Sequence, residues 1–309
     1  MAPKIPENML AAQVVEFKKP YKIHEVPTPG KDLNEHDPLA KVAVDSLCHT
    51  DGMVTDGIMR IQLPCIASHE GAGTIVKVGS ARKEFEVGVT VDGSFAECEV
   101  VDGREVCLLP DNVSFQCAVP LACAGITIWG GLVRGDLKVG ESLALVGAGG
   151  GLGHLGVQFA KALGLHVIAI DARDEGIQLA QQCGADTVID ARIGKEKVVE
   201  KVKTVTGGKG ADASINVSDR DTAAGLSAAV TKMHGILVQI AQPTTVSVPF
   251  AELVFRDIRI HGSLTGSRAE CQKMLEIVSK SGVKVKTTPF NGIKEVPKAV
   301  ELSHSGKMQ

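Results

Sequence analysis

Aromatic residues are scarce in this chain. They make up 3% of its 309 residues, with a single Trp and a single Tyr, so Val, Ile, Leu and Ala have to form most of the core. The chain also has no large excess of positive or negative charge. It contains 33 Lys and Arg and 36 Asp and Glu, which gives a net charge of −3. With so balanced a charge, neither nucleic acid nor an anionic membrane is expected as a partner.

Long apolar runs and paired cysteines are missing as well. No apolar run reaches the roughly 20 residues that span a bilayer, and the N-terminus MAPKIPENML lacks the apolar stretch of a secretory signal. Eight cysteines are scattered along the chain without one CxxC pair. In a chain of this size, that pattern favours reduced thiols in a cytoplasmic protein, with some of them available to a metal ion.

The pattern of the chain changes near its middle. Residues 1–120 contain short β-like segments broken by Gly and Pro, such as 41–47 and 73–80. From about residue 138, apolar strands alternate with helical stretches, which is typical of βαβ units and of a parallel sheet. The expected strands are 142–148, 166–171, 187–190, 213–218, 235–241 and 258–264. The expected helices between them are 154–164, 174–183, 195–206 and 221–233. Six such strands predict an α/β fold with a Rossmann doubly wound sheet.

A glycine-rich turn, VGAGGGLGHLG at 146–156, joins the first of these strands to its helix. Glycine is needed where a tight turn brings the backbone close to a dinucleotide pyrophosphate. A literal GxGxxG starts late relative to the strand, so we assign the turn to Gly147, Gly150, Gly151 and Gly153. The next strand ends at Asp171, where a carboxylate would bind the ribose hydroxyls and favour NAD over NADP. Arg173 nearby weakens that preference.

Four residues have the chemistry of a zinc site. Cys48 follows a β segment, His69 and Glu70 precede another, and Cys123 comes just before the Rossmann half. Cys and His ligands suit Zn²⁺, and three protein ligands leave open the fourth position that a catalytic zinc needs. On spacing alone, the alternative interpretation is that both cysteines are ordinary buried thiols.

Five motifs in chain order carry a resemblance: CHTD at 48–51, HEGAG at 69–73, VDGSFAE at 91–97, PLACAGIT at 120–127 and GGLG at 150–153. Together they resemble the zinc-containing medium-chain alcohol dehydrogenases of the yeast and fungal type, along essentially the whole chain. The resemblance implies one catalytic zinc ion, with NAD as the cofactor. The zinc ligands that it implies are Cys48, His69 and Cys123.

The resemblance also implies roles for residues around these two groups. Glu70 would be the carboxylate that can replace solvent at the metal, Asp51 would orient the His69 imidazole, and the Thr50 hydroxyl would take the alcohol proton. The residues implied at the cofactor are His49 at the pyrophosphate, Thr127 against the nicotinamide and Leu152 behind it. The implied reaction is reversible hydride transfer between NAD and a small primary or secondary alcohol or aldehyde, with zinc as Lewis acid.

The same resemblance implies a domain division. Residues 1–124 and 267–309 would form a GroES-like β-rich catalytic domain, and 125–266 the Rossmann NAD-binding domain. Family members assemble through the edge of the Rossmann sheet, so a homodimer or homotetramer is expected. Two alternatives stay open: a zinc-free, NADPH-dependent quinone or enone reductase of the same superfamily, and an inactive nucleotide-binding homologue.

Three departures from the family pattern bear on these expectations. At 86–91 the segment EVGVTV leads almost directly into DGSFAE. The four-cysteine lobe that binds a structural zinc in family members is therefore missing from this place. The chain also stops at 301–309 without the Gly-Arg and final strand of the family, which predicts weaker NAD binding. Met53 stands where the family often has the last histidine of a proton relay, which predicts slower proton release.

Overall fold

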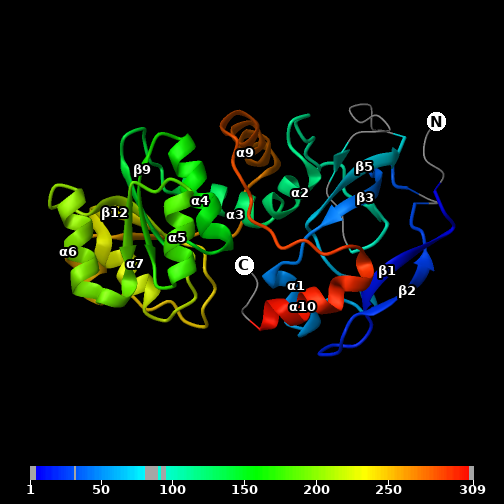
Figure 1. Ribbon diagram of the computed structural model, residues 1–309, viewed down its shortest axis with the longest axis horizontal. Helices are drawn as coiled ribbons and strands as arrows, with labels where there is room; N and C mark the ends of the chain where they lie inside the picture. Colours follow the sequence, from blue (N-terminus) through cyan, green and yellow to red (C-terminus); the bar gives the residue numbers. More distant parts are fainter. Residues whose placement is uncertain (1–4, 31–32, 81–89, 92–94, 306–309) are drawn as a thin grey trace. The chain divides into compact units, whose positions relative to one another are not determined.

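The chain forms two compact units, described here from a computed structural model that covers residues 5–30, 33–80, 90–91 and 95–305 (Figure 1). The first unit comprises residues 1–123 and 285–309, and the second comprises residues 124–284. The junction at 86–91 lies largely outside the described residues, as do the last four residues of the chain.

The first unit is built on two small sheets. One has the order β2-β1-β4 and is formed by β1 (Asn8–Val14), β2 (Lys22–Pro27) and β4 (Cys65–Ile66). The other has the order β6-β5-β3-β7 and is formed by β3 (Leu39–Asp45), β5 (Gly71–Lys77), β6 (Thr90–Val91) and β7 (Cys98–Val100). All neighbours pair antiparallel, and apolar residues such as Met9 and Leu39 fill a shared core. This β-rich architecture matches the expectation for the first half of the chain.

Short helices complete the first unit. They are α1 (His49–Thr55), α2 (Phe115–Ala118) with a 3₁₀ turn at 119–121, and α10 (Val296–His304) with a 3₁₀ turn at 293–295. The helix α10 was not expected from the sequence. Its Val296 packs with Tyr21 and Phe95 in an apolar cluster, which ties the end of the described chain to this unit.

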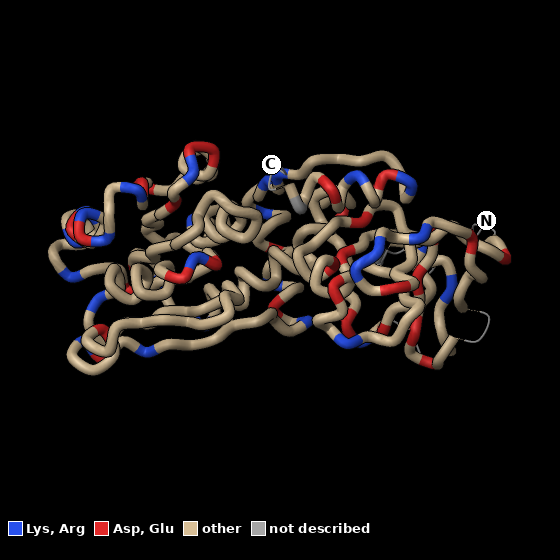
Figure 2. The backbone as a smooth tube through the Cα atoms, turned by 90° about the horizontal axis from the view of Figure 1, so that it is seen from below, with Lys and Arg blue, Asp and Glu red and all other residues tan. Residues whose placement is uncertain are grey.

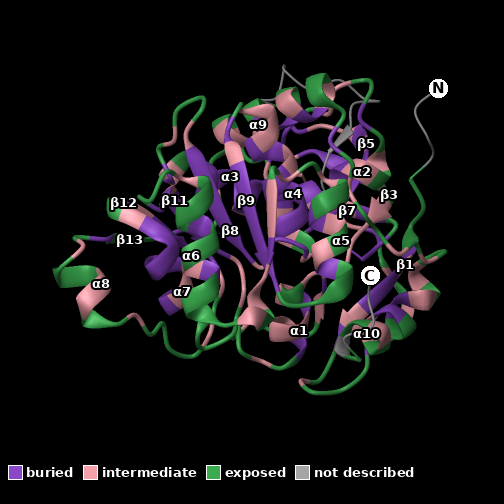
Figure 3. Cartoon of the chain, turned by 60° about the vertical axis from the view of Figure 1, so that its left-hand side comes forward, coloured by how far each residue is buried: buried purple, intermediate pink, exposed green. Residues whose placement is uncertain are grey.

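The second unit is a six-stranded parallel sheet of order β10-β9-β8-β11-β12-β13. Its strands are β8 (Ser142–Val146), β9 (His166–Asp171), β10 (Thr187–Asp190), β11 (Ala211–Asn216), β12 (Thr231–Gln239) and β13 (Arg259–Gly262). In chain order this is 3-2-1-4-5-6, the doubly wound Rossmann arrangement. Buried residues fill β8, β9 and β11, as Figure 3 shows, because a sheet covered by helices excludes water from its central strands. The predicted fold class is therefore confirmed.

Helices alternate with these strands along the chain. They are α3 (Ala124–Arg134), α4 (Gly151–Ala162), α5 (Asp174–Gln182), α6 (Lys195–Val205), α7 (Ala223–Val230), α8 (Phe250–Val254) and α9 (Arg268–Ser281). The single tryptophan, Trp129, is 5% exposed on α3 and meets the Phe159 ring of α4 edge to face, 5.6 Å between centroids. It is a core residue of the second unit.

The second domain boundary differs from the expected one. The sequence predicted a return to the first domain at 267, whereas the structure places it at 285. The reason is α9, which packs against α3 and α4 of the Rossmann unit. Its start is fixed locally, because Ser267 and Glu270 form a capping box at its first turn.

No single helix in the described part of the chain is long and apolar enough to cross a membrane. Two short helical segments, 115–121 and 124–134, meet that length and composition only when they are joined across a bend. Figure 2 shows basic and acidic residues interspersed along the chain, as the nearly equal numbers of the two charges predict.

Candidate functional site

Four potential metal-binding side chains converge in the first unit. One ligand atom from each of Cys48, His69, Glu70 and Cys123 lies within 4.8 Å of the other three. The Sγ atoms of Cys48 and Cys123 are 3.7 Å apart. The three ligands predicted from the sequence are thus brought together, although Cys123 stands 75 residues from Cys48 in the chain. This arrangement differs from the alternative interpretation, in which the two cysteines are ordinary thiols that do not share a site.

Three separate segments position these side chains. Cys48 is the N-cap residue of α1, and His69 and Glu70 end the loop that leads into β5. Cys123 immediately precedes α3. The Glu70 side chain is 3% exposed and accepts a hydrogen bond from the Ser46 hydroxyl, whereas His69 is exposed. Cys48 and Cys123 are half-buried, so an exposed imidazole beside two half-buried thiols and a buried carboxylate leaves the cluster open on the His69 side.

Asp51 ties two of these segments together. Its Oδ2 accepts the Cys48 backbone N–H at 2.8 Å, and its Oδ1 accepts the Ser68 backbone N–H at 2.9 Å. The residue is 1% exposed, so both bonds are shielded from water. The sequence predicted that Asp51 orients the His69 imidazole directly. The hydrogen bonds found here act on the backbone that carries the ligands, and the direct role stays a prediction.

Crowding of ionisable groups shifts their pKa values. The hydrogen bond with Cys123, together with burial, raises the pKa of the Cys48 thiol to about 12. Burial, and then the charge of Cys48, raises the pKa of the Glu70 carboxyl to about 8. Anionic ligands this close together repel one another unless a cation or bound protons neutralise them. The electrostatics therefore favour a cation among these four side chains.

The other residues expected near the metal lie on α1. The Thr50 Oγ1 is 3.8 Å from the Cys48 Sγ, so its hydroxyl borders the cluster. His49 is exposed, and Met53 is half-buried on the same short helix. The structure therefore places Thr50 next to the ligands but does not test its role as proton acceptor.

The glycine turn in the second unit has the form expected of a nucleotide site. Gly147 has φ +90°, which requires glycine, and a Cβ on Gly153 would lie 2.2 Å from the Gly147 carbonyl oxygen. A Cβ on Gly151 would meet no atom within 4 Å. The helix α4 begins at Gly151 after the N-cap residue Gly150, so its first N–H groups are free of helical acceptors, as anion binding requires.

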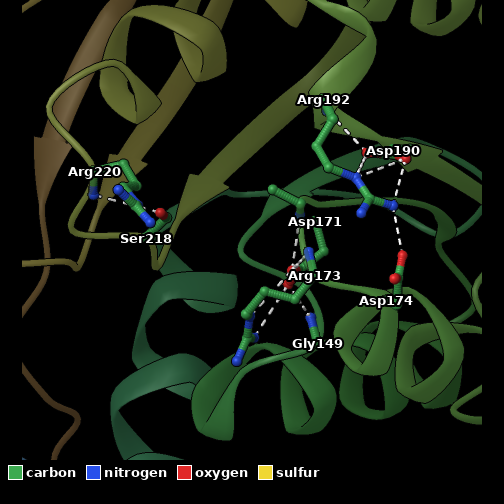
Figure 4. Close-up of polar contacts among 9 residues, drawn as sticks. Gly149, Asp171, Arg173, Asp174, Asp190, Arg192, Ser218 and Arg220 are labelled. Atoms are coloured by element: carbon green, nitrogen blue, oxygen red, sulfur yellow. Dashed lines mark hydrogen bonds and ion pairs between the residues drawn. The ribbon is translucent and has the colours of Figure 1, made fainter. Parts of the chain in front are cut away.

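Asp171 closes the turn from the end of β9 (Figure 4). Its carboxylate accepts N–H groups from Gly149 at 2.8 Å, Ala172 at 2.9 Å and Arg173 at 3.0 Å. The Arg173 guanidinium also lies 3.4 Å from it and is largely exposed. Asp171 is therefore a buried anchor of the turn as well as a candidate partner for ribose hydroxyls.

Two glycines of this site were missed in the sequence. A Cβ on Gly149 would lie 2.0 Å from the Gly176 Cα, and a Cβ on Gly176 would lie 2.6 Å from Asp171 Oδ1. Both glycines allow the turn to pack directly against α5. Gly149 could have been identified from its place in the glycine-rich run GAGGGLG, whereas no local sequence pattern marks Gly176. His154, on the first turn of α4, is also buried, at 4% exposure.

The remaining predicted cofactor residues lie in the second unit. Thr127 is half-buried on α3, and Leu152 is half-buried in the first turn of α4. Their contacts to nicotinamide stay predictions.

Comparison with known proteins agrees with this picture. Residues 34–134 match the family model described as alcohol dehydrogenase GroES-like domain, and residues 151–280 match the one described as zinc-binding dehydrogenase. Alcohol dehydrogenase 1 of Emericella nidulans is 30% identical over 93% of this chain and 91% of its own length. An alcohol dehydrogenase of Geobacillus stearothermophilus is 32% identical, covering 93% of this chain and 95% of its own. The crystal structure of the alcohol dehydrogenase of the archaeon Aeropyrum pernix superposes with a TM-score of 0.84 at 26% identity, over 97% of each chain.

A Rossmann unit joined to a GroES-like unit defines the class, which is that of the medium-chain dehydrogenases. Within that class, the chain belongs to the zinc-containing alcohol dehydrogenase family, whose members are oxidoreductases. The resemblance seen in the five sequence motifs is confirmed.

Proposed function

We propose that this protein is a zinc-dependent, NAD-linked alcohol dehydrogenase that acts on small primary or secondary alcohols and the corresponding aldehydes. The observation that carries the proposal is the cluster of Cys48, His69, Glu70 and Cys123. When bound there, zinc would supply Lewis acidity toward an alcohol oxygen, and NAD would accept the hydride.

The donor set fits zinc in kind and in spacing. Tetrahedral zinc with Zn–S bonds of about 2.3 Å separates two thiolates by about 3.8 Å. The Cys48 and Cys123 sulfur atoms are 3.7 Å apart, so they need little movement to bind one ion. His69 would provide the third ligand, which leaves a position for substrate. Glu70, which is held by Ser46, is the carboxylate available beside that position.

The residues of α1 are suited to handle the alcohol proton. The Thr50 hydroxyl borders Cys48 and has an acceptor lone pair for a proton from an alcohol bound beside it. Met53, one turn further along α1, has no group that carries a proton. The chain therefore lacks a titratable relay at this position, which supports the expectation of slow proton release.

The preference for NAD rests on Asp171. A buried carboxylate at the end of β9 would repel a 2′-phosphate and accept ribose hydroxyls. The exposed Arg173 guanidinium beside it is the feature that favours the rival, an NADPH-dependent reductase. Arg173→Ala is expected to weaken NADPH use more than NADH use, and a wild-type preference for NADPH would favour the rival reaction.

The proposal is tested by alcohol-dependent reduction of NAD in matched cysteine variants. Cys48→Ser and Cys123→Ser should each abolish turnover and lower zinc content, because each removes one thiolate ligand. Cys183→Ser is the control, since that thiol lies in the second unit and outside the cluster. If both Cys48→Ser and Cys123→Ser retain turnover, the zinc mechanism is contradicted. Tight NAD binding without any turnover would support the inactive homologue instead.

We also propose that the protein self-associates through the β13 edge of its parallel sheet. Among the described residues β13 pairs with β12 alone, and all four of its residues are exposed. Large apolar side chains lie exposed on α8, on β13 and in the residues that directly follow them: Phe250, Val254, Phe255, Ile260 and Leu264. An open strand edge beside such a surface suits a second copy of the same chain, which would bury both.

A further inference from the structure

Ser68, immediately before His69, has a backbone conformation that non-glycine residues avoid. Its φ is +74°, in the left-handed region. A Cβ atom is disfavoured there by contact with the neighbouring carbonyl group. Residues with such conformations persist only where surrounding contacts hold them, and they concentrate at functional sites. The side chain of Ser68 supplies contacts of this kind.

The Ser68 hydroxyl lies at the centre of a polar cluster. Its Oγ is 2.7 Å from Asp45 Oδ1 and 3.1 Å from the Ser46 carbonyl oxygen, and it accepts the Glu70 N–H at 3.2 Å. The Ser68 N–H donates to Asp51 Oδ1 at 2.9 Å. Asp45 Oδ1 also accepts the Ser46 N–H at 2.7 Å, which fixes the carboxylate toward Ser68.

These contacts join the two segments that carry candidate metal ligands. Asp45 ends β3, three residues before Cys48, and Asp51 binds the Cys48 N–H as well as that of Ser68. His69 itself is exposed, so packing around the imidazole does little to fix it. Apart from the hydrogen bond between its side chain and Cys48, its position is set by the backbone on either side.

We propose that Ser68 is a positioning residue for the metal site: clamped by Asp45, its hydroxyl holds the left-handed backbone that presents His69 and Glu70 to Cys48 and Cys123. This inference rests on the proposed zinc-dependent function. Groups that orient ligands in this way contribute on the order of 10–100-fold to metal affinity.

The test compares Ser68→Gly with Ser68→Ala in the full chain. Zn²⁺ and Co²⁺ affinities are measured by competition with a chelating indicator, and the visible spectrum of the Co²⁺ form reports ligand geometry. Ser68→Gly adopts the left-handed backbone without strain but loses the hydrogen bonds of the hydroxyl, so the metal-free protein should unfold near the wild-type temperature and above that of Ser68→Ala. Its metal affinity should nevertheless fall about tenfold, with an altered Co²⁺ spectrum, because the tether is lost. Ser68→Ala should lose both stability and affinity.

Two further comparisons separate positioning from general stability. Asp45→Asn keeps an oxygen acceptor for Ser68 and should retain near wild-type affinity, whereas Asp45→Ala should weaken affinity as Ser68→Gly does. Lys18→Gly is the matched control, because Lys18 also has a positive φ, +61°, but is exposed and outside the cluster. It should raise the unfolding temperature without changing metal affinity.

Wild-type affinity in both Ser68→Gly and Asp45→Ala would overturn the inference while leaving the proposed function intact. Asp45→Ala keeps the test decisive if Ser68→Gly does not fold. A wild-type protein that binds neither Zn²⁺ nor Co²⁺ would contradict the proposed function itself, and this inference with it.

Discussion

At the scale of single residues, the glycine turn offers a sharp contrast between two neighbours. Gly153→Ala should destabilise the second unit by about 1–3 kcal/mol, because its Cβ would lie 2.2 Å from a backbone oxygen that cannot move freely. Gly151→Ala should stabilise it by roughly 0.4–1 kcal/mol, because the site is open and the unfolded chain loses freedom. Denaturant unfolding followed by Trp129 fluorescence measures both. Equal effects of the two substitutions would contradict the geometry of the turn.

Met53 carries the second prediction at this scale. Met53→His would add a titratable group one turn after Thr50 on α1. If proton release is slow for want of such a group, kcat of the variant should exceed that of the wild type, most clearly near and above the ordinary imidazole pKa. The pH profile of kcat, with Met53→Leu as the control, measures this. Identical profiles for the histidine and leucine variants would show that proton release does not limit turnover.

Residue chemistry could be predicted only in part from the sequence. The thiol and imidazole donors were found because CHTD, HEGAG and PLACAGIT are distinctive, and the structure brings them together with Glu70. Ser68 and Gly176 could not be found, because their importance depends on a φ angle and on an approach between distant segments. No local pattern encodes either property.

At the scale of elements, the capping box of α9 sets a pH dependence. The backbone N–H of Ser267, and then its hydroxyl, lower the pKa of the Glu270 carboxyl below its usual 4.5. A carboxylate with a lowered pKa contributes stability above pH 4.5, and that stability is lost as the pH falls through the lowered pKa in the folded state. Glu270→Gln should therefore reduce stability at pH 7, and the difference from the wild type should shrink progressively as the pH falls below 4.5.

The control for this prediction is Glu276→Gln. Glu276 lies on the same helix and pairs with Lys280, but both side chains are largely exposed. An exposed i,i+4 pair contributes only about 0.3–0.5 kcal/mol, so this variant should change stability less. Thermal unfolding at several pH values decides the matter. A pH-independent effect of Glu270→Gln would rule out the carboxylate as the source.

The strands and helices of the Rossmann unit were largely predictable, because buried parallel strands are continuous apolar runs. The strands predicted at 166–171 and 187–190 have those bounds in the structure. The domain boundary at 267 stays a prediction, but the compact second unit extends to residue 284 and includes α9. The sequence could not place this helix, because an amphipathic helix packs on either unit with the same pattern. Only its tertiary contacts with α3 and α4 decide the assignment.

At the scale of the whole molecule, the exposed apolar surface predicts self-association. Phe255→Glu and Ile260→Glu should shift the protein toward monomers, because each buries a charge at the proposed interface. Val139→Glu is the control, since Val139 is 82% exposed elsewhere in the second unit. Sedimentation velocity at micromolar concentration measures the result. A wild-type protein that sediments as a monomer at every concentration would contradict this assembly.

The proposed zinc-dependent function is tested most directly by the zinc content of the purified protein, measured by elemental analysis. We expect about one zinc ion per chain, in keeping with one set of two thiolates, one imidazole and one carboxylate. That zinc should be lost in Cys48→Ser and retained in Cys183→Ser. A protein that holds no zinc, even after refolding with zinc supplied, would contradict the account.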